Sequence, residues 1–420
     1  MKFKDKRVLI IGAGASGRSA EAFLQSRGAK TFLYDDKLKL DVERLDCELA
    51  VLSPGVSINH ELAQRFRDKL ISELALGFTV RHKKIVAVTG TNGKTSVVNL
   101  IHQAMGDKRA VLCGNCGPPV TSVSESLRKK IPITEVSSYM METEMIKGRF
   151  RPRIAVILNI TQDHLDRHGT IENYIAHKEV LAKNQKRRDV LILNYDCANT
   201  KKLAEGKRQK ILWFSTKARV RGIYAEEGRV WLNTGRKACA VFDLGELGLH
   251  AEHQIQNFLA TALVCALLRV KRANLKNLRS VEEHRIEFVK TIDGASYYND
   301  SKGTNTAATL AAINSFSLPV HLILGGKRKG QDFAQFFAKL PAHVASVCVY
   351  GEDREHIAKA STVEVVECEG LEEAVRIASV GQGPRVVLLS PACASFDQFR
   401  DYVQRGERFR EIIEMSSSSL

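Results

Sequence analysis

Short apolar runs that end at glycine or Ser-Pro turns alternate with helical patterns at the start of the chain. The runs lie at residues 8–11, 31–34 and 51–52, and a helical stretch that ends near Ser26 separates the first two. This alternation of strand and helix predicts a small parallel α/β unit. Because a basic segment then precedes a new strand, the first domain is expected to span residues 1–81.

The middle of the chain predicts a larger α/β domain over residues 82–280. Between residues 219 and 249, short stretches separated by glycines predict a small antiparallel patch, and residues 257–268 form a long apolar helical pattern. Three apolar runs are typical of buried parallel strands: residues 85–88, 155–158 and 190–193.

The last segment, residues 281–420, repeats the α/β alternation. Each of its apolar runs ends in a Gly or Ser-Pro turn, which places ligand-binding groups at the carboxyl edge of a sheet. These runs lie at residues 320–324, 344–350 and 386–389. The predicted fold is therefore α/β with three domains. The first and last are Rossmann-like, and the central one carries a small antiparallel patch.

Composition narrows the possible partners. The chain is 44% hydrophobic and 26% charged, as in ordinary globular proteins, with a net charge of +16. Such a charge suits nucleic acid, an anionic membrane surface or anionic small molecules. The basic residues are spread out and no aromatic residues interleave with them, so phosphorylated small ligands are favoured. A nucleic-acid-binding ATPase remains an alternative.

Cysteine usage and the lack of long apolar runs favour a cytoplasmic protein. Nine cysteines, an odd number, suit free thiols in a reducing compartment. Cys113 and Cys116 form a C-x-x-C pair, but no second pair or nearby His completes a metal site. No apolar run approaches the roughly 18 residues of a membrane span. A monomer that binds neither membrane nor nucleic acid is expected.

The first glycine-rich turn predicts a diphosphate site. Residues 12–17 read Gly-Ala-Gly-Ala-Ser-Gly, directly after a strand and at the start of a helix. Glycines allow close backbone approach there, and the helix N-terminus attracts phosphate. Asp35 follows the next strand, where a ribose-binding acid would lie. A purely structural turn and an NAD-dependent oxidoreductase remain alternative interpretations.

The second glycine-rich turn, residues 90–95, predicts ATP binding. Its sequence Gly-Thr-Asn-Gly-Lys-Thr resembles a P-loop, although two residues rather than four separate the glycines. The backbone N–H groups would surround the phosphates, Lys94 would reach the β- and γ-phosphates, and the Thr95 hydroxyl would bind Mg²⁺. The central domain is therefore expected to be a P-loop-like ATPase domain with the small antiparallel patch.

This shorter loop is similar to that of the Mur ligases and the folylpolyglutamate synthetases. The resemblance continues in order along almost the whole chain, through residues 114–117, 134–138, 159–166 and 174–178. It implies ATP and two Mg²⁺ ions as cofactors, with Thr95, Glu135, His164 and Lys178 as metal-site residues. Lys178 matches the family's carbamylated lysine. The implied catalytic residues are Lys94, Lys178 and His164.

Two segments of the last domain resemble the D-glutamate-adding members of the Mur ligase family: residues 299–305 and 389–399. The resemblance implies that D-glutamate is joined to UDP-N-acetylmuramoyl-L-alanine through an acyl phosphate, in peptidoglycan precursor synthesis. A folylpolyglutamate synthetase is the nearest alternative. Two places depart from the family pattern: Gln254, where an Asn is usual, and the basic pair Lys327-Arg328.

The resemblance also implies three sets of binding residues. For ATP they are Gly90, Thr91, Asn92, Gly93, Lys94, Thr95, Ser96, Asn115, Asn257, Arg285 and Asp300. For the UDP-linked substrate they are Ala15, Ser16, Asp35, Asp36, Ser53, Pro54, Gly55 and Ser137. For D-glutamate they are Lys302, Thr304, Lys329, Ser395, Phe396 and Tyr402.

Overall fold

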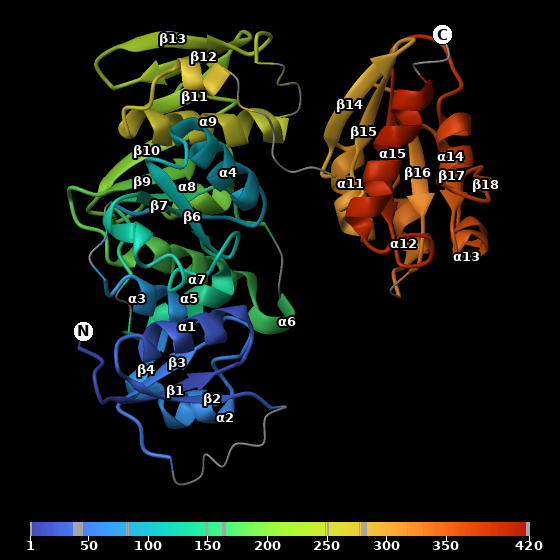
Figure 1. Cartoon of the computed structure of the whole chain (residues 1–420). Coiled ribbons are helices and arrows are strands. Elements are labelled where there is room, and N and C mark those ends of the chain that lie inside the picture. The colour runs from blue at the N-terminus through green and yellow to red at the C-terminus, as the bar shows by residue number, and fades with distance from the viewer. Residues whose placement is uncertain are drawn as a thin grey trace. The chain divides into compact units, whose positions relative to one another are not determined.

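The computed structural model divides the chain into two units, Met1–Arg279 and Ser280–Leu420. It describes residues 2–36, 45–80, 82, 84–147, 150–161, 165–247, 249, 252–276, 278, 284–316, 318–328 and 330–416. The strands of these residues form three sheets, two in the first unit and one in the second, as Figure 1 shows. They are called the first, second and third sheet below.

The first sheet is wholly parallel, with strand order β2-β1-β3-β4. Its strands are β1 (Arg7–Ile11), β2 (Lys30–Tyr34), β3 (Leu49–Leu52) and β4 (Leu70–Ser72). The helices α1 (Ala15–Gln25) and α3 (Glu73–Gly77) pack on one face, and α2 (Glu61–Arg65) packs on the other. The strands predicted at residues 8–11, 31–34 and 51–52 are confirmed.

The second sheet has strand order β13-β12-β11-β10-β9-β8-β5-β7-β6. Its parallel strands are β5 (Val86–Thr89), β6 (Ala110–Gly114), β7 (Ile131–Glu135), β8 (Ile154–Ile157), β9 (Val190–Asn194), β10 (Lys210–Ser215) and β11 (Gly222–Glu226). β12 (Arg229–Asn233) and β13 (Ala238–Asp243) then continue the sheet antiparallel, which confirms the predicted antiparallel patch.

Helices bury both faces of the second sheet, which explains its nearly continuous apolar strands. One face packs against α4 (Lys94–Met105), α9 (Glu252–Leu267) and α10 (Ala273–Lys276). The other packs against α5 (Ser138–Lys147), α7 (Ile171–Lys183) and the residue that follows α8 (Ala198–Lys202). The short helix α6 (Leu165–His168) precedes α7. The long helix predicted at residues 257–268 is therefore confirmed, and it begins five residues earlier, at Glu252.

The third sheet has strand order β14-β15-β19-β16-β17-β18. Its strands are β14 (Glu287–Ile292), β15 (Ala295–Asn299), β16 (Val320–Gly325), β17 (Val344–Tyr350), β18 (Val366–Cys368) and β19 (Arg385–Ala392). β14 runs antiparallel to β15, and the remaining neighbours are parallel. One face packs against α11 (Thr306–Ile313), α12 (Phe333–Ala338) and α13 (Arg354–Lys359), and the other against α14 (Leu371–Ala378) and α15 (Tyr402–Ser416).

In each sheet, the glycine-rich or polar turns identified in the sequence follow the carboxyl ends of the strands, as expected for parallel α/β folds. The α/β fold class is confirmed. None of the described helices is both long and apolar enough to pass through a lipid bilayer.

Candidate functional site

The loop of residues 90–95 joins β5 to α4 at the carboxyl edge of the second sheet. Gly93 has φ +83° and caps α4, a conformation that favours glycine. A Cβ on Gly93 would also lie 2.3 Å from Oδ1 of Asn257, so Asn257 lies against this loop. The Lys94 ammonium donates to the carbonyls of Gly90 at 3.0 Å and Thr91 at 2.9 Å. The loop therefore has the strand–turn–helix context of a phosphate-binding site.

Thr95 and Glu135 form the second part of this site. The Thr95 hydroxyl donates to Oε2 of Glu135 at 2.8 Å, and Nδ2 of Asn115 donates to Oε1 at 2.7 Å. Glu135 is only 1% exposed. Three residues predicted from separate motifs are thus in direct contact. A hydroxyl and a carboxylate this close are the hard oxygen ligands that Mg²⁺ prefers.

Lys178 lies under the same loop. It is 1% exposed, and its ammonium donates to the carbonyl of Gly90 at 2.8 Å. The ammonium also lies 4.4 Å from the centroid of the Tyr174 ring. Lys178 is therefore a buried residue of the site. His164 falls outside the described residues. Among the described residues, no three His, Cys, Asp or Glu side chains gather as a metal cluster.

Asn159 was missing from the predicted site residues, yet it holds the phosphate loop. Its Oδ1 accepts the N–H of Asn92 at 2.8 Å, and its Nδ2 donates to the Asn92 carbonyl at 3.1 Å. The Thr91 hydroxyl likewise donates to the Thr161 carbonyl at 3.2 Å. Asn159 opens the motif that contains His164, so its position in that motif was the available signal.

The turn of residues 12–17 lies at the carboxyl edge of the first sheet. A Cβ on Gly17 would lie 1.8 Å from the Gly12 carbonyl, so the turn requires glycine there. The Ser53 hydroxyl donates to this same carbonyl at 2.9 Å, and Oδ2 of Asp35 accepts the N–H of Ala13 at 2.9 Å. The structure therefore brings together three segments that the sequence predicted to hold the UDP end of a substrate.

Asp36 lies beside them, and Ser137 lies in the second sheet's domain. Oδ1 of Asp36 accepts the Tyr34 hydroxyl at 3.0 Å and lies 3.3 Å from Nε2 of His60. The hydrogen bond from Tyr34 to Asp36 raises the pKa of the phenol. The Ser137 hydroxyl accepts the N–H of Met140 at 3.3 Å, at the start of α5.

In the second unit, the segments predicted to bind ATP and D-glutamate meet at the carboxyl edge of the third sheet. Asp300 follows β15 and is 3% exposed. Its Oδ2 accepts the Ser390 hydroxyl at 2.6 Å, and its Oδ1 accepts the N–H of Ile286 at 3.2 Å. The Lys302 ammonium lies 5.9 Å from the centroid of the Tyr402 ring. Ser395 is buried, whereas Phe396 is 66% exposed.

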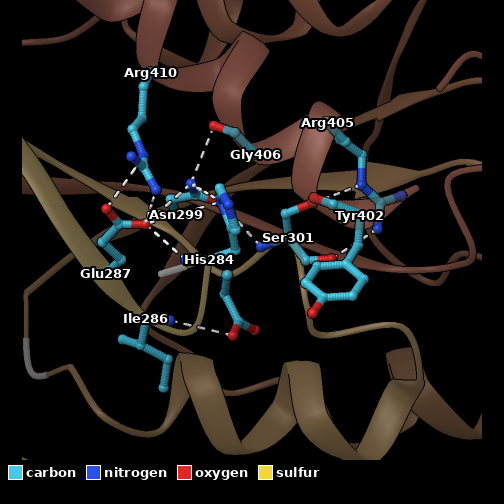
Figure 2. Close-up of polar contacts among 10 residues, drawn as sticks. His284, Ile286, Glu287, Asn299, Ser301, Tyr402, Arg405, Gly406 and Arg410 are labelled. Carbon is cyan, nitrogen blue, oxygen red and sulfur yellow. Dashed lines mark hydrogen bonds and ion pairs between the residues drawn. The ribbon is translucent and has the colours of Figure 1, made fainter. Parts of the chain in front are cut away.

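Arg405, on α15, connects these segments, as Figure 2 shows for Ser301. It is fully buried, and its Nε donates to the Ser301 hydroxyl at 2.9 Å. Its Nη2 donates to the carbonyls of Ser301 at 2.8 Å and Cys393 at 3.1 Å. A buried guanidinium with several acceptors fixes their mutual positions. No local pattern predicts this role, since Arg405 lies on a helix 104 residues from Ser301 along the chain.

His284 and Asn299 anchor the beginning of this unit to α15. Nδ2 of Asn299 lies 2.9 Å from Nδ1 of His284 and donates to the Gly406 carbonyl at 3.1 Å. Figure 2 shows Asn299 between these two residues. Arg285 is exposed beside His284. Lys329 falls outside the described residues.

The two departures from the family pattern lie in different units. The Lys327 ammonium lies 3.1 Å from Oε1 of Glu352, and Nε of Arg328 lies 3.0 Å from Oδ1 of Asp353. Both basic residues are thus paired within the second unit, on the turn that follows β16. Gln254 lies on α9, one residue after His253.

Comparison with known proteins identifies the family. Residues 88–265 match the Mur ligase middle domain, and residues 284–393 match the Mur ligase, glutamate ligase domain. A UDP-N-acetylmuramoylalanine--D-glutamate ligase of Koribacter versatilis is 37% identical, with 98% of each chain covered. The ligase of the same name from Acidobacterium capsulatum is 36% identical, covering 98% of this chain and 97% of its own.

Solved structures show the same fold. The MurF ligase of Thermotoga maritima in complex with ADP has a TM-score of 0.57 and 15% identity, covering 99% of this chain and 96% of its own. Since two family domains match and a relative covered over 98% of its length is 37% identical, the chain belongs to the Mur ligase family.

Proposed function

We propose that the protein is an ATP-dependent ligase that joins D-glutamate to UDP-N-acetylmuramoyl-L-alanine in peptidoglycan precursor synthesis. The observation that carries the proposal is the contact of Thr95, Glu135 and Asn115 beside the 90–95 loop. The full-length relatives that bear the name of this ligase supply the choice of substrates.

The phosphate loop accounts for the ATP requirement. A carboxylate is a poor electrophile, and transfer of the γ-phosphoryl group converts its oxygen into a good leaving group. The loop N–H groups and Lys94 would hold and stabilise the transferring phosphoryl group by position and charge. The D-glutamate amine would then attack the acyl phosphate and expel phosphate. Asn257, which lies against Gly93, would contact the nucleotide.

Mg²⁺ fits the oxygen donors of this site. Thr95 and Glu135 would hold one ion, and the family resemblance assigns a second ion to His164 and to Lys178 as a carbamate. When bound, Mg²⁺ neutralises charge between the phosphates and the substrate carboxylate. Magnesium usually relies on one or two protein oxygens together with phosphates and water, which suits this donor set.

The remaining segments would bind the other two substrates. In the first unit, the turn of residues 12–17 with Asp35, Asp36 and the 53–55 loop would hold the UDP end. In the second unit, a cation and several hydroxyl or amide donors suit a dicarboxylate. The proposed D-glutamate residues are Lys302, Thr304, Lys329, Ser395, Phe396 and Tyr402.

The proposal also covers the domain boundaries, the oligomeric state and the cellular location of the protein. We infer domains at residues 1–81 for the UDP-linked substrate, 82–280 for ATP and 281–420 for the amino acid. We also infer a cytoplasmic monomer that acts on small molecules.

The direct test is release of phosphate from ATP in the presence of UDP-N-acetylmuramoyl-L-alanine. D-glutamate should support phosphate release, whereas L-glutamate should not. A folate acceptor in place of the UDP-linked substrate should not support it either. Lys94→Ala should lower kcat/KM at least about 100-fold, since it removes a group that stabilises the transferring phosphoryl. Lys84→Ala, an exposed lysine just before β5, is the control and should keep full activity. Phosphate release that is independent of D-glutamate, or unchanged in Lys94→Ala, would contradict the proposal.

A further inference from the structure

Arg167, on α6, makes a bidentate ion pair and belongs to none of the motifs described above. Its Nε donates to Oε1 of Glu142 at 2.7 Å, and its Nη2 donates to Oε2 at 2.8 Å. The Glu142 side chain, on α5, is 4% exposed, so water scarcely reaches the pair. The Arg167 guanidinium carbon also lies 4.3 Å from the centroid of the ring of Tyr139, which lies on α5 like Glu142. The bidentate pair fixes the direction of the guanidinium plane.

The same guanidinium reaches the first sheet. Its Nη2 also donates to the carbonyl of Val56 at 2.9 Å. Val56 directly follows the 53–55 loop, and its own N–H donates to the Ser53 carbonyl at 3.0 Å. The Ser53 hydroxyl in turn holds the Gly12 carbonyl of the glycine-rich turn. One nitrogen therefore links α5 to the loop and turn that would hold the UDP end.

We propose that Arg167 is a positioning residue for the UDP-linked substrate. Ser137 stands immediately before α5, while the 53–55 loop belongs to the first sheet, so the two proposed substrate contacts come from different sheets. Arg167 keeps them at a fixed separation by binding Glu142 on one side and Val56 on the other. This inference rests on the proposed function, because it concerns the same substrate.

The inference predicts a selective kinetic effect. Within the described part of the chain, Arg167 contacts Glu142, Val56 and Tyr139, none of which belongs to the 90–95 loop. Removing it should displace the UDP-binding loop without moving the phosphate loop. Contacts that hold a substrate equally in the ground state and the transition state appear in KM, so a rise of about tenfold or more in KM for the UDP-linked substrate is expected. KM for ATP should change less than about twofold, because the phosphate loop keeps its position.

The experiment compares Arg167→Met and Arg167→Lys with the unmodified full chain. The measurements are KM and kcat for each of the three substrates, and calorimetric binding of UDP-N-acetylmuramoyl-L-alanine without ATP. Lysine keeps the positive charge but lacks the planar guanidinium that binds both carboxylate oxygens. The rise in KM for the UDP-linked substrate should therefore be smaller in Arg167→Lys than in Arg167→Met. Arg153→Met is the matched control. Arg153 pairs with the buried Asp189 at the amino edge of the second sheet, so its loss should leave every KM unchanged.

Each outcome of this experiment either supports or overturns the proposed role of Arg167. A rise in KM and a loss of calorimetric affinity confined to the UDP-linked substrate support the inference. Equal changes for all three substrates, or no change, overturn it and leave Arg167 a structural residue. If Arg167→Met does not fold, the same comparison is made with Arg167→Lys. If the unmodified protein itself fails to bind the UDP-linked substrate, the proposed function fails instead.

Discussion

At Gly406, the absence of a side chain allows α15 to approach the start of the second unit. A Cβ built there would lie 2.0 Å from Nδ1 of His284, which is 2% exposed. The Gly406 carbonyl meanwhile accepts a hydrogen bond from Asn299. Gly406 lies in the interior of α15, where glycine is normally disfavoured by about 1 kcal/mol relative to alanine. Close packing against His284 therefore explains why glycine occupies position 406, although helix propensity alone disfavours it.

We predict that Gly406→Ala destabilises the protein by about 1–3 kcal/mol, because the new methyl group overpacks a buried contact. The measurement is denaturant unfolding monitored by circular dichroism. Gly370→Ala is the control, since its backbone is extended and a Cβ there meets nothing within 4 Å. Because Gly370 is the N-cap of α14, alanine there should cost at most about 1 kcal/mol through weaker capping, with no cost of overpacking. Stabilisation in Gly406→Ala, as expected from propensity alone, would contradict this packing argument.

At the scale of elements, the short helix α3 joins the first sheet to the second. Oε1 of Glu73, its first residue, accepts both the N–H and the hydroxyl of Thr121 at 2.7 Å. The preceding Ser72 hydroxyl donates to Oε1 of Glu144 on α5 at 2.7 Å. Glu73 is 1% exposed, and this burial raises its pKa. The carboxylate form is thus disfavoured in the folded state relative to the unfolded state.

We predict that stability falls as the pH rises through the raised pKa of Glu73. A proton bound more tightly in the folded state stabilises it at low pH, and this contribution is lost above the folded pKa. Glu73→Gln should remove this pH dependence, since its amide oxygen can still accept both bonds from Thr121. Thermal midpoints at pH 5 and pH 8 test this. The control is Glu125→Gln, whose side chain is 76% exposed and which should follow the unmodified protein.

Local pattern predicted the elements well, because strands and helices depend on neighbouring residues. The runs at residues 8–11 and 190–193 match β1 and β9 closely. The order of strands was not predictable, since β5 lies between β8 and β7 through contacts distant in sequence. The same reason hid Asn159 and Arg405, since Asn92 lies 67 residues from Asn159 and Ser301 lies 104 residues from Arg405 along the chain.

At the scale of the whole molecule, burial separates the cysteines into two groups. All nine lie in the described part of the chain, and all are free. Cys116, Cys197 and Cys239 are partly exposed, and the other six are buried. Burial raises the pKa of the thiols to about 12 at four of these: Cys113, Cys265, Cys348 and Cys393. A thiol that stays protonated is a poor nucleophile.

We predict that iodoacetamide at pH 8 modifies Cys116, Cys197 and Cys239 first in the native protein. Modification of the other six should require unfolding, because their thiolates are both scarce and inaccessible. Peptide mass spectrometry after timed alkylation identifies each site, and alkylation in guanidinium chloride is the control in which all nine react. Early labelling of Cys113 or Cys348 in native protein would show that the described burial is wrong.

The Lys94 ammonium is held by two carbonyls of its own loop, Gly90 and Thr91. Under the proposed function, a phosphate oxygen would share this ammonium with the two carbonyls, since a lysine ammonium carries three donors. The carbonyls would hold the positive charge in place before a ligand arrives, so the side chain would lose little further rotamer freedom on binding. The internal hydrogen bonds of the lysine would thus prepare the loop for a polyphosphate in advance.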